Sequence, residues 1–121
     1  MLRGVRGATT VEQDSPEEIY QATRELLLDM LGKNGIERED IASVFFSTTP
    51  DLRSAFPARA ARDPDVGFEG VPLMGMQESP IEQGLPRCIR ILIHWNSEKQ
   101  QRDIVHSYLR AAQKLRPDLS S

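Results

Sequence analysis

Cys88-Ile89-Arg90-Ile91-Leu92-Ile93-His94-Trp95 is the most strand-like run of this chain. Successive side chains of a strand point to opposite faces of its sheet. One face then holds an apolar set, Ile89, Ile91, Ile93 and Trp95, and the other holds Cys88, Arg90, Leu92 and His94. A guanidinium keeps its charge at any workable pH and is costly to bury without an anion. The second face therefore directs Arg90 at a negative group, either an internal Asp or Glu or a ligand.

A long amphipathic helix precedes this strand. Ser15 is the predicted N-cap, Pro16 takes the first helical position, and Glu18 completes a capping box. The next apolar residues recur at helical spacing and form one stripe, which predicts a helix that covers one face of a sheet. The stripe consists of Ile19, Ala22, Thr23, Leu26, Leu27, Met30 and Leu31, and the predicted helix ends at Gly32, Asn34 and Gly35.

Further strands are predicted on both sides of the helix. Leu2 to Thr10 and Ile41 to Ser47 are β-rich, and Phe56 to Arg62 indicates a short helix. Val71 to Met74 indicates a short edge strand, because proline is confined to strand edges. Ile104 to Leu115 fits either a helix or a strand by its spacing, so periodicity leaves this segment open.

Composition predicts one globular domain over residues 1–121. A hydrophobic fraction of 39% and a charged fraction of 27% are ordinary for such a domain. A net charge of −3 disfavours nucleic acid and anionic membranes as partners. No apolar run is long enough for a membrane span, and the first residues lack the apolar core of a signal peptide. Because a single cysteine fits a reducing compartment, we expect a cytoplasmic protein.

The candidate chemistry depends mainly on arginine. Two histidines and one cysteine share no ligand spacing, so we expect no metal and no cofactor. Cys88 lies in a buried strand where a thiol ionises poorly, which disfavours it as a nucleophile. Clustered guanidiniums suit a small dianion, because each can bind a carboxylate bidentately. The arginines near the predicted elements are Arg6, Arg59, Arg62, Arg87, Arg90 and Arg116. These residues predict a pocket for a carboxylate-rich molecule and leave the reaction open.

Several stretches, in order along the chain, resemble the small chorismate mutases of the Bacillus type, the AroH class. They are Arg3 to Glu12, Thr49-Pro50-Asp51-Leu52, Ala55 to Ala60, Val71-Pro72, Met76-Gln77-Glu78, Cys88-Ile89-Arg90, Tyr108-Leu109 and Leu115 to Leu119. The resemblance implies an α+β fold with a mixed five-stranded sheet, one long helix and one short helix. It implies a homotrimeric pseudo-barrel with active sites between subunits, and a mostly extended segment from Ile104 to Leu115. The tail at about residues 116–121 is expected to be mobile.

The resemblance also implies the reaction, the Claisen rearrangement of chorismate to prephenate on the shikimate pathway to phenylalanine and tyrosine. Arg90 would donate to the breaking ether oxygen, and Arg6 would hold a substrate carboxylate. Glu78 would accept the ring hydroxyl, and Tyr108 would donate to a substrate oxygen. The other implied substrate-binding residues are Phe56, Ala58, Arg59, Arg62, Leu73, Met74, Gly75, Met76, Gln77, Leu115 and Arg116. Met74-Gly75 stands where Thr-Cys is common in that class, so side-chain recognition of the hydroxyl differs there.

Two other functions remain open on the sequence. One is a non-catalytic trimeric module that binds a small dicarboxylate metabolite, since fold alone does not fix function. The other is a hydrolase that uses Cys88, which thiol alkylation without loss of activity would exclude.

Overall fold

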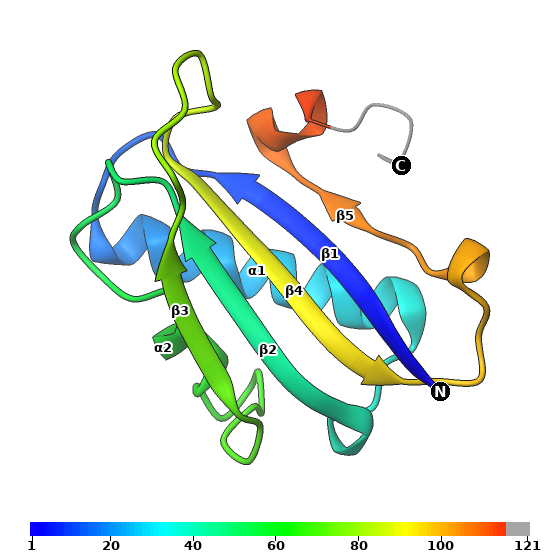
Figure 1. Cartoon of the computed structure of the whole chain (residues 1–121). Coiled ribbons are helices and arrows are strands. Elements are labelled where there is room, and N and C mark those ends of the chain that lie inside the picture. Colours follow the sequence, from blue (N-terminus) through cyan, green and yellow to red (C-terminus); the bar gives the residue numbers. More distant parts are fainter. Residues whose placement is uncertain (116–121) are drawn as a thin grey trace.

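The computed structural model describes residues 1–115 as one mixed sheet with two α-helices (Figure 1). This architecture confirms the predicted five-stranded sheet with one long and one short helix. Arg116 and the tail, residues 116–121, lie outside the described residues. The elements are β1 (Leu2–Thr10), α1 (Pro16–Asn34), β2 (Ile41–Thr48), α2 (Ala58–Ala61), β3 (Leu73–Gln77), β4 (Cys88–Asn96) and β5 (Ser107–Tyr108), with 3-10 helices at Arg38–Asp40, Gln101–Asp103 and Arg110–Lys114.

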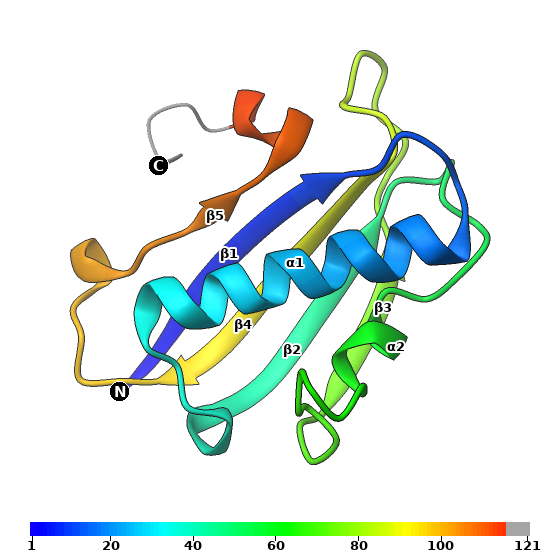
Figure 2. The same ribbon diagram turned by 180° about the vertical axis from the view of Figure 1, so that it is seen from behind.

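The strand order is β3-β2-β4-β1-β5, with the Arg90 strand at the centre. β4 pairs antiparallel with both β2 and β1, and the edge strands β3 and β5 run parallel to their neighbours. Figure 2 shows α1 lying across one face of this sheet, with α2 on the same side. We call the opposite face, which carries neither of the two α-helices, the open face.

The alternation predicted for β4 is confirmed. Ile89, Ile91, Ile93 and Trp95 are all buried. Ile91, Ile93 and Trp95 belong to the main core, which also contains Leu26 and Met30 of α1. Arg90, Leu92 and His94 are half-buried on the open face, and Cys88 is buried there beside Tyr108.

The helix begins and ends where the sequence predicts, with one difference at its start. Ser15 Oγ accepts a hydrogen bond from the amide of Glu18 at 3.3 Å, and Gly35 ends the helix at φ +66°. The predicted capping box is wrong in its second half. The Glu18 carboxylate accepts from the amides of Glu12 and Gln13, at 3.2 and 3.3 Å, and so binds the loop before the N-cap.

The C-terminal segment corrects the expectation of a mostly extended chain. Only Ser107–Tyr108 is strand, paired with Gly7 and Ala8 of β1. Arg110 then adopts φ +53°, which ends the strand and begins the 3-10 helix Arg110–Lys114, whose Ala112 packs against Ala8 and Cys88. The open choice between helix and strand for this segment is therefore resolved as a short strand followed by a 3-10 helix.

Gly7 allows α1 to pack closely on β1, and replacing it should destabilise the fold. A Cβ at this position would collide with the sulfur of Met30 and lie 3.1 Å from Leu26 Cδ1. We expect Gly7→Ala to lower the free energy of unfolding by about 1 to 3 kcal/mol, measured by urea denaturation. Gly32→Ala is the control, because nothing lies within 4 Å of its Cβ and helical alanine is favoured. Equal stability of Gly7→Ala and the parent would contradict the close packing.

Candidate active site

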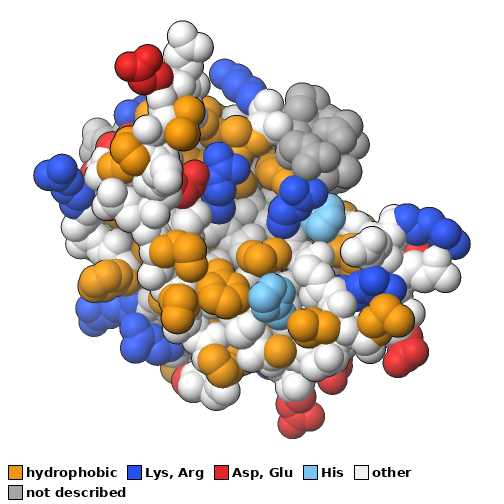
Figure 3. Space-filling view, viewed as in Figure 1, with side chains coloured by type: hydrophobic (Ala, Val, Ile, Leu, Met, Phe, Trp, Pro, Cys, Tyr) orange, Lys and Arg blue, Asp and Glu red, His pale blue; other side chains and the backbone are white. Residues whose placement is uncertain are grey.

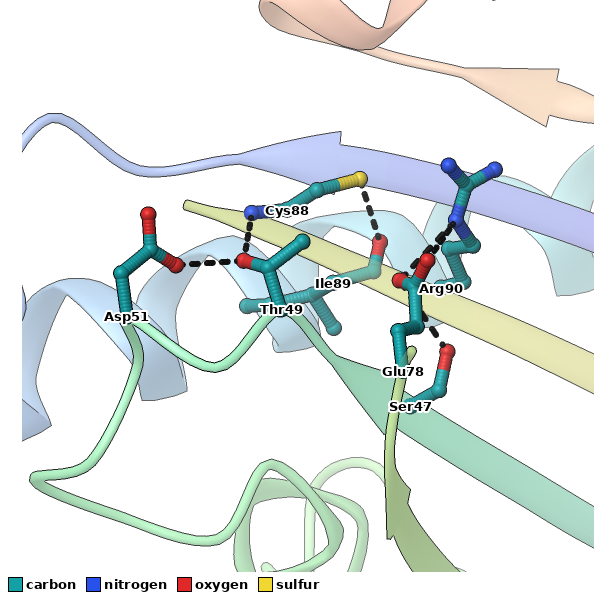
Figure 4. Close-up of polar contacts among 7 residues, drawn as sticks. All are labelled: Ser47, Thr49, Asp51, Glu78, Cys88, Ile89 and Arg90. Carbon is teal, nitrogen blue, oxygen red and sulfur yellow. Dashed lines mark hydrogen bonds and ion pairs between the residues drawn. The ribbon is translucent and has the colours of Figure 1, made fainter. Parts of the chain in front are cut away.

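Arg90 and Glu78 form an ion pair on the open face (Figure 4). Arg90 Nε donates to both carboxylate oxygens of Glu78 at 3.0 Å. Ser47 Oγ donates to the same carboxylate over a longer 3.4 Å. The backbone amide of Glu78 donates to the carbonyl of Thr48 at 2.8 Å, which places the carboxylate just beyond the end of β3. The negative partner expected for Arg90 is therefore an internal glutamate.

This ion pair leaves most of the guanidinium available. Figure 4 shows the two terminal nitrogens of Arg90 pointing away from Glu78. The Arg90 side chain is 42% exposed, and within residues 1–115 its hydrogen bonds go to Glu78 alone. Because one edge is anchored and the other is open, Arg90 can hold a ligand oxygen without giving up its internal partner.

The strand register aligns Arg90 with other predicted site residues. Directly paired residues point to the same side of a sheet, so one row crosses all five strands on the open face. The row consists of Met76, Ser47, Arg90, Ala8 and Tyr108.

The adjacent row on the open face contains the second predicted arginine. It consists of Met74, Phe45, Leu92 and Arg6. Tyr108 is buried, and Leu115 packs against the small cluster that contains it. The structure therefore brings Arg6, Arg90 and Tyr108 to one face, with Glu78 beside them.

The remaining predicted residues lie at a different place. A cavity of about 1060 Å³ opens on the helix side of β3, and its wall includes Phe56, Arg59, Arg62, Gly75 and Gln77. Gly75 and Gln77 pair with Phe46 and Thr48, and so face away from Arg90. Ala58 and Leu73 pack against the main core. Within one chain, the predicted site is thus divided between two surfaces.

The open face is apolar around the charged pair. Figure 3 shows hydrophobic side chains gathered there, with basic side chains nearby. Met74 is 58% exposed and Met76 is 47% exposed. A shallow hollow of about 370 Å³ lies beside Met76, and its lining residues are Phe45, Phe46, Ser47, Met76, Arg90 and Leu92. Exposed apolar area of this kind is typical of a surface that another molecule covers.

Asp14 anchors the loop that leads to Phe56. Its carboxylate accepts hydrogen bonds from the amides of Arg53 and Ser54, at 3.0 to 3.1 Å, and from Ser54 Oγ at 2.7 Å. The Ser54 hydroxyl, followed by these amides, lowers the pKa of Asp14. The carboxylate consequently stays ionised, and this loop anchor is lost only as the pH falls through that lowered pKa.

Cys88 is expected to be chemically inert in the folded protein. Burial raises the pKa of its thiol to about 11, although the nearby Arg90 lowers it in part. We predict that iodoacetamide at pH 8 labels Cys88 only after denaturation, as read by mass spectrometry. Because the folded pKa lies above the ordinary 9.0, stability should fall as the pH rises from about 9 to about 11. Cys88→Ala should remove that part of the decline, and rapid labelling of the native protein would contradict the burial.

Residues 1–115 contain no group of three or more His, Cys, Asp or Glu residues that could hold a metal ion. None of their helices is long and apolar enough to cross a membrane.

Comparison with known proteins identifies the family. The sequence-family model of chorismate mutase type I matches residues 2–119. This chain belongs to that family. It is 55% identical to chorismate mutase AroH of Thermus thermophilus, over 100% of this chain and 98% of the relative. It is 44% identical to chorismate mutase AroH of Bacillus subtilis (strain 168), over 99% and 94%.

A solved structure shares the fold. Chorismate mutase from Clostridium thermocellum matches with a TM-score of 0.89 and 43% identity, over 93% of this chain and 98% of that one. The resemblance noted from the sequence motifs is therefore confirmed, and so is the mixed five-stranded sheet with two helices that it implied.

Proposed function

We propose that the protein converts chorismate to prephenate without a cofactor, and that Arg90 supplies the main electrostatic contribution. Membership of the chorismate mutase family makes this chain an isomerase of phenylalanine and tyrosine biosynthesis. The free cysteine, buried and without a disulfide partner, fits action in a reducing cytoplasm.

The chemistry suits a site built from fixed charges. The rearrangement breaks a C–O bond and forms a C–C bond within one molecule, with no proton transfer and no nucleophile. An enzyme can help by holding the compact conformer and by stabilising charge that develops in the transition state. The breaking ether oxygen becomes more negative, so a cation placed there binds the transition state more tightly than the substrate.

Arg90 is the residue best placed for this role. Its terminal nitrogens point away from its partner Glu78, and its side chain is partly exposed (Figure 4). The ion pair fixes the guanidinium before substrate arrives, so little reorganisation is needed during the reaction. This geometry of Arg90 carries the proposal.

The neighbouring groups account for the rest of the substrate. We assign a carboxylate to Arg6, the ring hydroxyl to Glu78, and a second substrate oxygen to the hydroxyl of Tyr108. Met74 and Leu115 provide apolar contacts on the same face. Arg116 is also assigned by resemblance and lies outside the described residues.

We further propose that the site is completed by a second copy of the chain in a homotrimer. Phe56, Arg59 and Arg62 line the cavity on the helix side, whereas Arg90 lies on the open face. A closed ring of three copies can bring the helix-side cavity of one chain next to the open face of its neighbour. The exposed Met74 and Met76 would then be covered by the neighbouring subunit.

The direct test mixes purified protein with chorismate and follows its absorbance, with sedimentation to measure the assembly. Loss of chorismate signal and appearance of prephenate are expected from a trimer. Binding without turnover would instead favour a non-catalytic dicarboxylate-binding module. A monomer with full activity would overturn the shared site.

A further inference from the structure

Two side chains in the turn after β2 bind the backbone that leads into the Arg90 strand. Thr49 Oγ1 accepts from the amide of Cys88 at 2.9 Å and donates to Asp51 Oδ1 at 2.5 Å. Asp51 Oδ2 accepts from the amide of Arg87 at 2.9 Å. The amide of Thr49 also donates to the carbonyl of Cys88 at 3.1 Å. Figure 4 shows the hydrogen bonds that join Asp51 to Thr49 and Thr49 to Cys88, which lies two residues before Arg90.

These bonds hold the backbone where it is strained. Arg87 has φ +48°, a left-handed conformation that residues other than glycine rarely adopt. Such a conformation persists only where the surroundings fix it. Asp51 and Thr49 bind the consecutive amides of Arg87 and Cys88, and so fix the point at which β4 begins.

The same end of β2 also holds Glu78. Ser47 donates to the Glu78 carboxylate, and the carbonyl of Thr48 accepts from the Glu78 amide. Ser47 pairs with Arg90 across β2 and β4. Ser47 and Thr48 therefore hold Glu78, and the next residue, Thr49, holds the start of the Arg90 strand. A slip of one residue in this register would turn Arg90 toward the helices.

We infer that Thr49 and Asp51 are positioning residues for the rearrangement. They set the start of β4 and thereby the direction of the Arg90 guanidinium, without any need to touch the substrate. The inference rests on the role proposed for Arg90. Misplacement of a catalytic group by about 1 Å can reduce a rate about 100-fold, so loss of this support should appear in the chemical step.

The test replaces Thr49 by Val, which keeps the shape and removes the hydroxyl. We expect kcat on chorismate to fall about 10-fold while KM changes less than about 3-fold. Thr49→Ser keeps the hydroxyl and should restore kcat to within about 3-fold of the parent. Asp51→Asn loses one of the two carboxylate oxygens that accept these hydrogen bonds, and it should also lower kcat. This second variant keeps the inference testable if Thr49→Val does not fold.

Thr23→Val is the matched control, because Thr23 is a buried threonine of α1 whose hydroxyl donates to the carbonyl of Ile19 at 2.7 Å. It should lower the Tm without lowering kcat. Unchanged kcat in folded Thr49→Val, or equal loss in Thr49→Ser, would overturn the inference while leaving the role of Arg90 intact. Full activity of Arg90→Ala would instead overturn the proposed mechanism itself.

Discussion

Arg90→Ala is expected to lower kcat by about 1000-fold, with a smaller change in KM. Removing one preorganised donor from developing negative charge typically costs a factor of about 100 to 1000, and Arg90 is also a full cation. An interaction made mainly in the transition state appears in kcat more than in KM. Steady-state assays on chorismate, followed by its absorbance, give both constants. A kcat near that of the parent would contradict the role given to this residue.

Arg90→Lys separates charge from geometry. An ammonium keeps the charge, but it cannot donate to Glu78 through one edge and to a ligand through the other. We therefore expect this variant to remain at least about 100-fold below the parent in kcat. Arg24→Ala is the control: it removes a half-buried arginine of α1 that pairs with Asp65, and should leave kcat unchanged.

Two inactive variants should restore activity when they assemble together. One carries Arg90→Ala, and the other carries both Arg59→Ala and Arg62→Ala. If Arg90 and the Arg59–Arg62 surface come from neighbouring subunits, random mixed trimers contain intact sites. Equal mixing then gives about one quarter of the parental sites. The measurement is kcat/KM after the two chains are unfolded and refolded together.

The matched control mixes Arg90→Ala with Glu78→Ala. Both substitutions lie on the same surface of one chain, since Arg90 Nε is 3.0 Å from Glu78 Oε1. No combination of these chains produces an intact site, so no recovery is expected. Recovery in this control, or its absence in the first mixture, would contradict sites shared between subunits.

Much of the fold could be predicted from the sequence, because its strongest patterns are local. The alternating run from Cys88 and the capped helix from Ser15 each carry their own periodicity and end signals. The segment from Ile104 onward could not be predicted this way. Its short strand depends on pairing with β1, and its turn depends on the left-handed Arg110.

The candidate site, like the fold, was predictable from the sequence only in part. Alternation alone placed Arg90 opposite the core face, and the charge argument required a negative partner. That this partner is Glu78 depends on the β2–β3 and β2–β4 registers, which periodicity does not determine. Ser47 and the bonds of Thr49 and Asp51 were missed for this reason. A strand-pairing argument could have found Ser47, because it lies directly beside Arg90.

The central role of Arg90 can be tested most directly with a bound mimic of the transition state. A crystal structure with a stable bicyclic ether dicarboxylate would show which ligand atoms the terminal nitrogens of Arg90 contact. We predict one of them about 3 Å from the bridging oxygen, with Nε still on Glu78. Terminal nitrogens that contact only carboxylates, with the bridging oxygen unbound, would contradict the mechanism.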